Sequence, residues 1–294
     1  MSAAKTISVI GYASLDYSMS ILDFELWGKT SIIGRRLSSS WPEAGGIARL
    51  LPGLVGSSTV NAISWVGEDS TSQLWIDALE RSGSSTLGVS RIPGTAPTSY
   101  LFHDHAGRTM CFFDPGILDA SLMTLSQRPT EYVRDSDVVV SAVSPQAATR
   151  QMLEVIRPES LLAWVIKADP HSLPLDLRIR LLKRADVVIY SHQEDEFLAS
   201  ALGTGPAGKT LDELPGKVLI RTAGDGDIRW NRDAEKGSCA VTPISQIIDS
   251  TGAGDWFAGQ FLGMYLVTAD VVSSIEWAIS STRDFLQNRE KQEE

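Results

Sequence analysis

The run Asp249-Ser-Thr-Gly-Ala-Gly-Asp255 has the residue types and the spacing that phosphoryl transfer requires. Gly252, Ala253 and Gly254 lack bulky side chains, so their backbone N–H groups can approach an anion closely. A short extended segment precedes the run and a long apolar helical stretch follows it, which places these groups at the positive end of a helix. Asp255 then stands where its carboxylate could receive the proton of a hydroxyl group. A tight turn with an acidic residue in the first helical turn is the structural alternative, and glycine spacing alone does not decide between the two.

A second glycine-rich run, Gly203-Thr-Gly-Pro-Ala-Gly208-Lys209-Thr210, matches the phosphate-loop pattern GxxxxGK[ST] letter for letter. That pattern needs a strand before the loop and a long helix after it. Here the residues from Glu194 to Leu202 have helical character, and Pro215 ends any following helix within about one turn. We therefore expect a helix end followed by a connection, and not a phosphate loop.

Composition limits the classes of partner. The chain has 294 residues, of which 43% are hydrophobic and 21% charged, so it can bury a large core. Its net charge of -10, without a basic run, disfavours a nucleic-acid partner. Cys111 and Cys239 lack metal-ligand spacing, which indicates a reducing compartment and no zinc. The apolar run that ends at Ile10 is too short for a signal peptide or a membrane span, so we expect a cytoplasmic protein that does not bind membranes.

Short β-branched runs alternate with amphipathic stretches along most of the chain, which predicts βαβ units and a mainly parallel sheet with helices on both faces. The strand-like runs are Thr6 to Ile10, Ala62 to Val66, Val138 to Val143, Leu161 to Ala168, Val187 to Tyr190 and Val218 to Thr222. The helical stretches include Ser72 to Arg81, Gln146 to Ile156 and Leu175 to Lys183. The polar end of the chain, Gln287 to Glu294, is expected to fray.

Two stretches, about 17–44 and 98–113, alternate polar and apolar residues without a helical period. They predict antiparallel strands outside the main sheet, which would form a lid over the carboxyl ends of the parallel strands, where open α/β sheets bind ligands. Trp27 and Trp41 lie in this lid and could stack on a sugar or a base. An exposed lid edge also favours a homodimer.

The segment from Asp249 to Gly259 closely resembles the C-terminal signature D-T-x-G-A-G-D-x-F-x-G of the ribokinase-like (PfkB) carbohydrate kinases. Weaker matches follow the family's order along most of the chain, at Gly11-Tyr-Ala-Ser-Leu-Asp16, Gly45-Gly46, Trp65-Val-Gly67-Glu-Asp69, Ala168-Asp169-Pro170, Ser191-His-Gln-Glu194 and Thr222-Ala-Gly224. The resemblance implies a ribokinase-like three-layer α/β/α fold over residues 1–294, as one domain with a mainly parallel central sheet and a small β lid. It also implies ATP-dependent phosphorylation of a hydroxyl group of a sugar or a sugar-like molecule.

The same resemblance implies roles in phosphoryl transfer and in substrate binding. Asp255 would be the base on the substrate hydroxyl, and Gly252 to Gly254 would form an anion hole for the transferring group. Asp16 would hold substrate hydroxyls, beside the substrate-side diglycine Gly45 and Gly46. A carboxylate suits the role of Asp16 because it can accept two hydrogen bonds from a vicinal diol.

On the nucleotide side, the resemblance implies that Ser191, Thr222 and Gly224 border ATP. Glu194 would organise Mg²⁺ through water, because this hard cation prefers oxygen ligands and keeps much of its hydration. Asp249 and neighbouring carbonyl groups would hold a monovalent cation, as in some family members. Each residue also has a structural interpretation, such as a strand end for Thr222 or a first-turn helix residue for Glu194.

The sequence departs from the family at the place where an asparagine usually binds substrate, because Leu50 stands there. A leucine side chain forms no hydrogen bond, so another residue must supply the contact, and Arg49 would suit a carboxylate or a phosphate. Ser191 also replaces a usual asparagine. Two alternatives therefore stay open: a nucleoside kinase, which the run from Gly45 to Arg49 resembles, and a catalytically silent sugar- or nucleotide-binding protein on the same fold.

Overall fold

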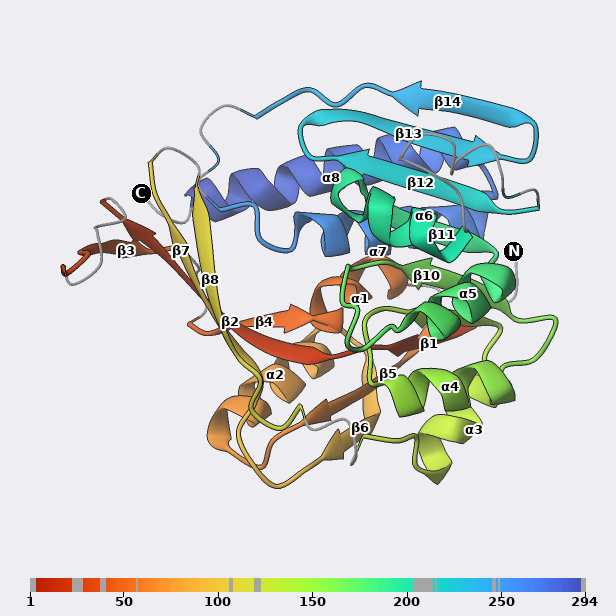
Figure 1. Cartoon of the computed structure of the whole chain (residues 1–294), viewed down its shortest axis with the longest axis horizontal. Coiled ribbons are helices and arrows are strands. Elements are labelled where there is room, and N and C mark those ends of the chain that lie inside the picture. Colours follow the sequence, from red (N-terminus) through yellow and green to blue (C-terminus); the bar gives the residue numbers. More distant parts are fainter. Residues whose placement is uncertain are drawn as a thin grey trace.

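The computed structural model describes residues 4–22, 29–37, 41–56, 58–105, 108–118, 123–202, 214, 216–244, 247 and 249–291. Its main element is a nine-stranded sheet in which neighbouring strands are parallel except at one edge, where two strands join antiparallel (Figure 1). In spatial order the strands are β14 (Glu235–Cys239), β13 (Gly226–Arg232), β12 (Val218–Ala223), β11 (Val187–Ser191), β10 (Leu161–Val165), β9 (Val138–Ser141), β1 (Thr6–Ile10), β5 (Thr59–Val66) and β6 (Ser85–Arg91).

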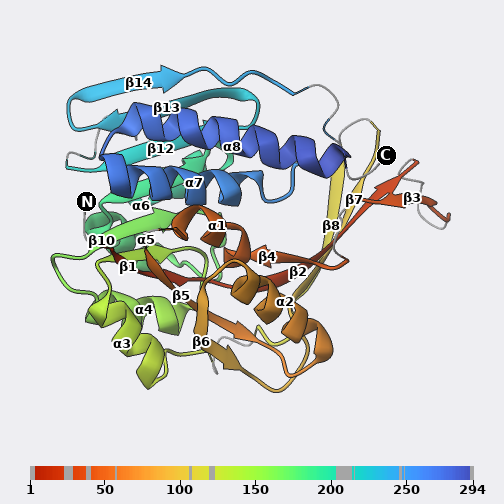
Figure 2. The same cartoon turned by 180° about the vertical axis from the view of Figure 1, so that it is seen from behind.

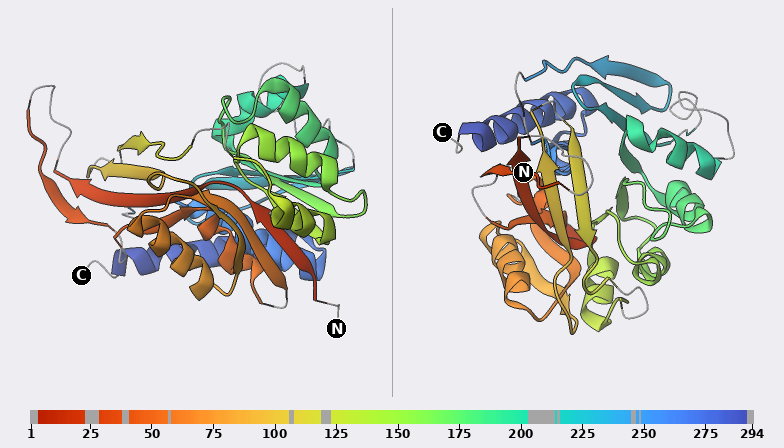
Figure 3. Two further views of the ribbon diagram at one scale, coloured as in Figure 1. Left: turned by 90° about the horizontal axis from the view of Figure 1, so that it is seen from below. Right: turned by 60° about the vertical axis from the view of Figure 1, so that its left-hand side comes forward.

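Helices cover both faces of this sheet, as Figures 2 and 3 show. On one face lie α1 (Leu51–Leu54), α2 (Ser70–Arg81), α7 (Ala253–Thr268) and α8 (Val271–Lys291). On the other lie α3 (Gln127–Asp135), α4 (Gln146–Val155), α5 (Leu175–Arg184) and α6 (Asp195–Leu202). The predicted α/β/α fold is confirmed.

The apolar strands explain why both faces are covered. Successive residues of a strand point to opposite faces, so Val138 and Val140 pack into the core with α7 and α8, whereas Val139 packs into the core with α4 and α5. All three side chains are at most 1% exposed. A sheet buried in this way needs continuous β-branched runs, and these are what the sequence showed.

The C-terminal helix extends further than predicted. α8 continues to Lys291 and buries Val271, Ile275 and Ala278 against the sheet. The prediction that the chain frays from Gln287 onward was therefore wrong as far as Lys291, because Arg289 forms several part-buried polar contacts at the site described below.

A smaller five-stranded sheet lies beyond the carboxyl ends of the parallel strands (Figure 3). Its strands are β3 (Ile33–Arg36), β2 (Ala13–Ile21), β7 (Thr98–His103), β8 (Thr109–Asp114) and β4 (Glu43–Gly46), which pairs with β2. The prediction of purely antiparallel strands was wrong for one pair, because β2 and β7 are parallel. They follow the parallel strands β1 and β6 and so leave the main sheet in the same direction.

Three glycines let α1 and α7 pack against each other with their backbones in contact. A Cβ at Gly259 would collide with the Leu50 carbonyl group, and one at Gly263 would collide with the Gly53 carbonyl group. This close approach fixes the amino end of α7 next to the turn Ile47–Arg49, which joins β4 to α1.

Two sequence features lie outside the described residues: the run from Gly203 to Thr210 and Trp27. The helix expected before that run is present as α6, which ends at Leu202. Among the described helices, none is long and apolar enough to cross a membrane.

Candidate active site

The run from Asp249 to Asp255 forms a tight turn at the amino end of α7. Gly252 is the residue before the helix and has a φ of 81°, a left-handed conformation that favours glycine. The Ala253 N–H donates to the Ser250 carbonyl group at 3.1 Å and closes the turn. A Cβ built on Gly254 would meet no atom within 4 Å, so the chain is open to an approaching group at this point. The turn therefore resembles an anion-binding site at a helix terminus, here called the anion cradle. The Ala253 N–H is already used in a hydrogen bond within the turn.

Asp255 lies in the first turn of α7 and faces the cavity described below. Burial raises the pKa of its carboxyl group, and the negative charges of Asp16 and Glu194 raise it further. The positive charges of Lys167 and Arg49 oppose this effect, but the pKa stays above its ordinary value. A carboxylate with a raised pKa accepts a proton more readily, which suits a general base.

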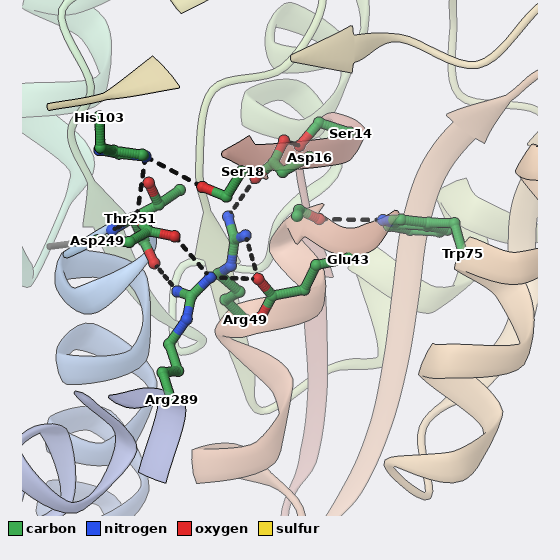
Figure 4. Close-up of polar contacts among 11 residues, drawn as sticks. Ser14, Asp16, Ser18, Glu43, Arg49, Trp75, His103, Asp249, Thr251 and Arg289 are labelled. Carbon is green, nitrogen blue, oxygen red and sulfur yellow. Dashed lines mark hydrogen bonds and ion pairs between the residues drawn. The ribbon is translucent and has the colours of Figure 1, made fainter. Parts of the chain in front are cut away.

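Asp16 lies on β2 with only 4% of its surface exposed. Its Oδ1 accepts a 3.0 Å hydrogen bond from the Ser14 hydroxyl group, and its Oδ2 accepts a 2.5 Å bond from Arg49 Nη1 (Figure 4). Arg49 Nη2 also lies 3.3 Å from Glu43 Oε2. The predicted substrate-binding carboxylate is thus already paired with the predicted substrate-binding arginine.

The diglycine holds β4 against β2 beside Asp16. A Cβ at Gly45 would collide with the Asp16 carboxylate, and one at Gly46, which has a φ of 61°, would collide with the Tyr12 carbonyl group. The Gly45 carbonyl group accepts a 3.0 Å hydrogen bond from the Trp75 indole (Figure 4). Gly45 and Gly46 therefore contribute close backbone packing around Asp16.

A cavity of about 410 Å³ joins these parts at the carboxyl ends of β1, β9 and β10. The site residues predicted from the sequence that line this cavity are Asp16, Gly46, Arg49, Gly252 and Asp255. The rest of the wall is largely apolar and includes Leu50, Leu101, Phe113, Leu118, Val143 and Val165. The structure thus brings the predicted base, the substrate-side carboxylate and the glycine turn to one place.

The residues predicted to border the nucleotide lie outside this cavity, at the ends of β11 and β12. Ser191 and Thr222 are paired neighbours in the sheet, and Gly224, with a φ of 65°, turns the chain towards β13. Glu194 Oε2 accepts a 2.8 Å hydrogen bond from the Ser191 N–H, and the Ser191 Oγ accepts one from Gln193, so the pair caps the turn before α6. In the described part of the chain, no group of three or more His, Cys, Asp and Glu could hold a metal ion.

Asp249 has protein partners on both of its oxygens (Figure 4). Its Oδ1 accepts a 2.8 Å hydrogen bond from the Thr251 N–H and lies 3.5 Å from His103 Nε2, and its Oδ2 lies 3.1 Å from Arg289 Nη2. Burial raises the pKa of Asp249, but Arg289, Ser18, Thr251 and His103 together lower it below its ordinary value. A cationic side chain therefore neutralises this carboxylate, which does not fit the predicted role as a ligand of a monovalent cation.

Three residues of the site were not predicted as site residues from the sequence. Lys167 lines the cavity just after β10 and is exposed to it, and its charge lowers the pKa of Asp255. Arg289 and His103 contact Asp249 from α8 and β7. A lysine after a predicted parallel strand could have been singled out, because that edge binds ligands, but no local pattern pairs Arg289 with a residue 40 positions earlier.

The chain resembles known kinases in sequence and in structure. It is 24% identical to an uncharacterized sugar kinase of Archaeoglobus fulgidus over 71% of this chain and 84% of that protein. The structure superposes on a nucleoside kinase of Methanocaldococcus jannaschii with a TM-score of 0.77 and 16% identity, covering 97% of this chain and 93% of the other. An Arabidopsis thaliana ribokinase complexed with ribose and ATP gives a TM-score of 0.76 and 18% identity, with the same coverage.

The model of the pfkB family carbohydrate kinases matches residues 44–281, which include the diglycine, the turn at Gly252 and Asp255. The two solved structures have little sequence in common with this chain, so they support the fold alone. Since the family match spans most of the chain, the protein belongs to the pfkB family of carbohydrate kinases.

Proposed function

We propose that this protein transfers the γ-phosphoryl group of ATP to a hydroxyl group of a sugar or a nucleoside. The observation that carries the proposal is that Asp16, Asp255 and the Gly252 turn line one cavity at the positive end of α7. A base, an anion cradle and a carboxylate for substrate hydroxyls are the parts that phosphoryl transfer to an alcohol needs.

In the proposed reaction, the oxygen of the acceptor hydroxyl group attacks the γ-phosphorus of ATP. The bond between this phosphorus and the β–γ bridging oxygen breaks, and ADP leaves with the bonding electron pair. The hydroxyl proton passes to the Asp255 carboxylate. The backbone dipoles at the start of α7 stabilise the charge on the transferring group, because this helix end is positive before the reaction begins.

The nucleotide would lie on the side of β11 and β12, bordered by Ser191, Thr222 and Gly224. Mg²⁺, when bound with ATP, would neutralise phosphate charge, and Glu194 is a carboxylate on this side that would hold it through water. The proposal includes no monovalent cation, because Arg289 already neutralises Asp249.

The acceptor would fill the cavity between Asp16 and Asp255. Its apolar wall, with Phe113, Leu118 and Val143, suits a substrate that has a flat apolar part, and this observation supports a nucleoside as the second candidate acceptor. A bare sugar would use Asp16 but would leave much of this wall uncovered. Leu50 is 1% exposed and lines the same space, so it adds apolar surface where the family usually carries an asparagine.

A substrate panel tests the proposal. Purified protein is incubated with ATP, Mg²⁺ and sugars, sugar acids or nucleosides, and ADP and the phosphorylated product are measured together. Acceptor-dependent formation of both in equal amounts is the expected result. Binding of ATP and of an acceptor without product would instead support the silent binding protein, and failure to bind ATP would refute the nucleotide site.

The small sheet would act as the lid of this site and as the surface of a homodimer. Cys111 and Phe113 on β8 line the cavity, whereas Tyr100, Met110 and Phe112 lie on the other face and are at least 40% exposed. A second copy could cover this apolar face. Light scattering at several concentrations tests this proposal, and a mass of one chain throughout would contradict it.

A further inference from the structure

Arg49 is a buried cation in which one side-chain nitrogen has no hydrogen-bond partner among the described residues. It lies in the turn Ile47–Arg49, and only 6% of its surface is exposed. Its Nη1 and Nη2 are paired with Asp16 and Glu43. Its Nε is buried and has no hydrogen-bond partner within the part of the chain that the structure describes. A buried donor without a partner is costly, which points to a partner that binds during function.

The unpaired Nε faces the glycine turn. The three atoms nearest to a Cβ built on Gly252 are Arg49 Cδ, Nε and Cζ, so the guanidinium lies against the first glycine of the anion cradle. Arg49 also interacts electrostatically with Asp255, the proposed base. Arg49, Gly252 and Asp255 thus surround the same end of the cavity.

We propose that Arg49 is a catalytic residue that stabilises the transferring phosphoryl group through its Nε–H, together with the backbone at Gly252. This inference rests on the proposed function, and it assigns Arg49 to the phosphoryl group instead of to an anionic group of the acceptor. In the transfer, the bond to the bridging oxygen of ADP breaks as the bond to the acceptor oxygen forms. Arg49 keeps its proton throughout and donates a hydrogen bond to a phosphoryl oxygen.

The pairing of Arg49 explains why the other two nitrogens are excluded from this role. Asp16 and Glu43 hold Nη1 and Nη2, and the planar fork then fixes the direction of Nε. A donor that is oriented before the reaction stabilises developing charge without reorganisation. The Asp16 carboxylate therefore both binds the acceptor and orients Arg49.

Arg49→Lys separates this role from a structural one. A lysine keeps the positive charge opposite Asp16 but has only methylene groups beside Gly252. Arg184→Lys is the control, because Arg184 also pairs with a carboxylate, that of Asp186, but does not line the cavity. Circular dichroism and the affinity for ADP show whether each variant is folded.

The first measurement is steady-state turnover with the acceptor found in the substrate panel. Removing one donor to developing charge typically costs roughly 10²- to 10³-fold in kcat, and we expect a loss in this range for Arg49→Lys, with the KM values for acceptor and ATP within about threefold of wild type. Arg184→Lys should lose less than about fivefold. An Arg49→Lys variant with a raised acceptor KM and an unchanged kcat would overturn the proposal, because Arg49 would then bind the acceptor.

The second measurement needs no turnover. Titration calorimetry compares the affinity for ADP with and without aluminium fluoride, which mimics the transferring phosphoryl group, in the presence of Mg²⁺. Aluminium fluoride should tighten ADP binding in the wild type and in Arg184→Lys, and at least tenfold less in Arg49→Lys. Equal tightening in all three proteins would overturn the proposed role of Arg49 but not the proposed function. No tightening in the wild type would refute phosphoryl transfer at Gly252, and the proposed function with it.

Discussion

Arg289 Nη2 lies 3.1 Å from Asp249 Oδ2 and 2.5 Å from Glu43 Oε2, so one side chain near the end of α8 joins the loop before α7 to β4. Its Nη1 also donates a 2.6 Å hydrogen bond to the Thr251 carbonyl group. The last helix of the chain therefore holds the glycine turn in place from behind.

Replacing Arg289 by methionine should destabilise the protein. The variant leaves the buried Asp249 carboxylate and the Glu43 carboxylate without this cation, and breaking a buried ion pair costs about 3–5 kcal/mol. Urea unfolding followed by circular dichroism measures the free energy of unfolding. A change below about 1 kcal/mol would show that the network contributes little to stability.

The close contact between α1 and α7 predicts a large effect of a small substitution. Gly263→Ala should lower the free energy of unfolding by about 1–3 kcal/mol, because the new methyl group would collide with the Gly53 carbonyl group. Gly254→Ala is the control, since its Cβ would enter open space. It should change stability by no more than about 0.5–1 kcal/mol. Thermal melts of both variants test the difference, and equal melting temperatures would contradict the packing account.

Lys167 should set the lower end of the pH range in which the enzyme is active. Asp255 must be deprotonated to act as a base, so activity is lost as the pH falls through its pKa, which burial has raised. The Lys167 charge opposes that rise, so Lys167→Met should raise the pKa further and move the acid limb of kcat/KM to higher pH. Lys167→Arg keeps the charge and should leave the limb in place. An acid limb that does not move in Lys167→Met would contradict the electrostatic coupling.

Much of the fold could be predicted because its determinants are local. The strand Thr6–Ile10 was predicted at its observed bounds, and the helix from Gln146 was predicted to within one residue. Continuous β-branched runs and amphipathic periods specify a buried parallel sheet and its covering helices. The parallel pairing of β2 with β7 was missed, because it depends on the direction in which two distant strands leave the main sheet.

The site was predictable where a motif carries the chemistry. One cavity brings together Asp16, Gly252 and Asp255, to which the family resemblance assigns their roles. The ion pair between Arg49 and Asp16, and that between Arg289 and Asp249, were not predicted. These pairs join segments that are 33 and 40 residues apart, and no periodic pattern in the sequence specifies such contacts.

Turnover by Asp255→Asn tests the central claim most directly. Asparagine fills nearly the same volume but does not act as a base at neutral pH, and a positioned base contributes roughly 10²- to 10⁴-fold to the rate. We expect kcat for phosphorylation of the acceptor to fall by at least about 10²-fold, while the dissociation constant for ATP stays within about threefold of the wild-type value. Turnover within about threefold of wild type would remove Asp255 from the mechanism and contradict the account.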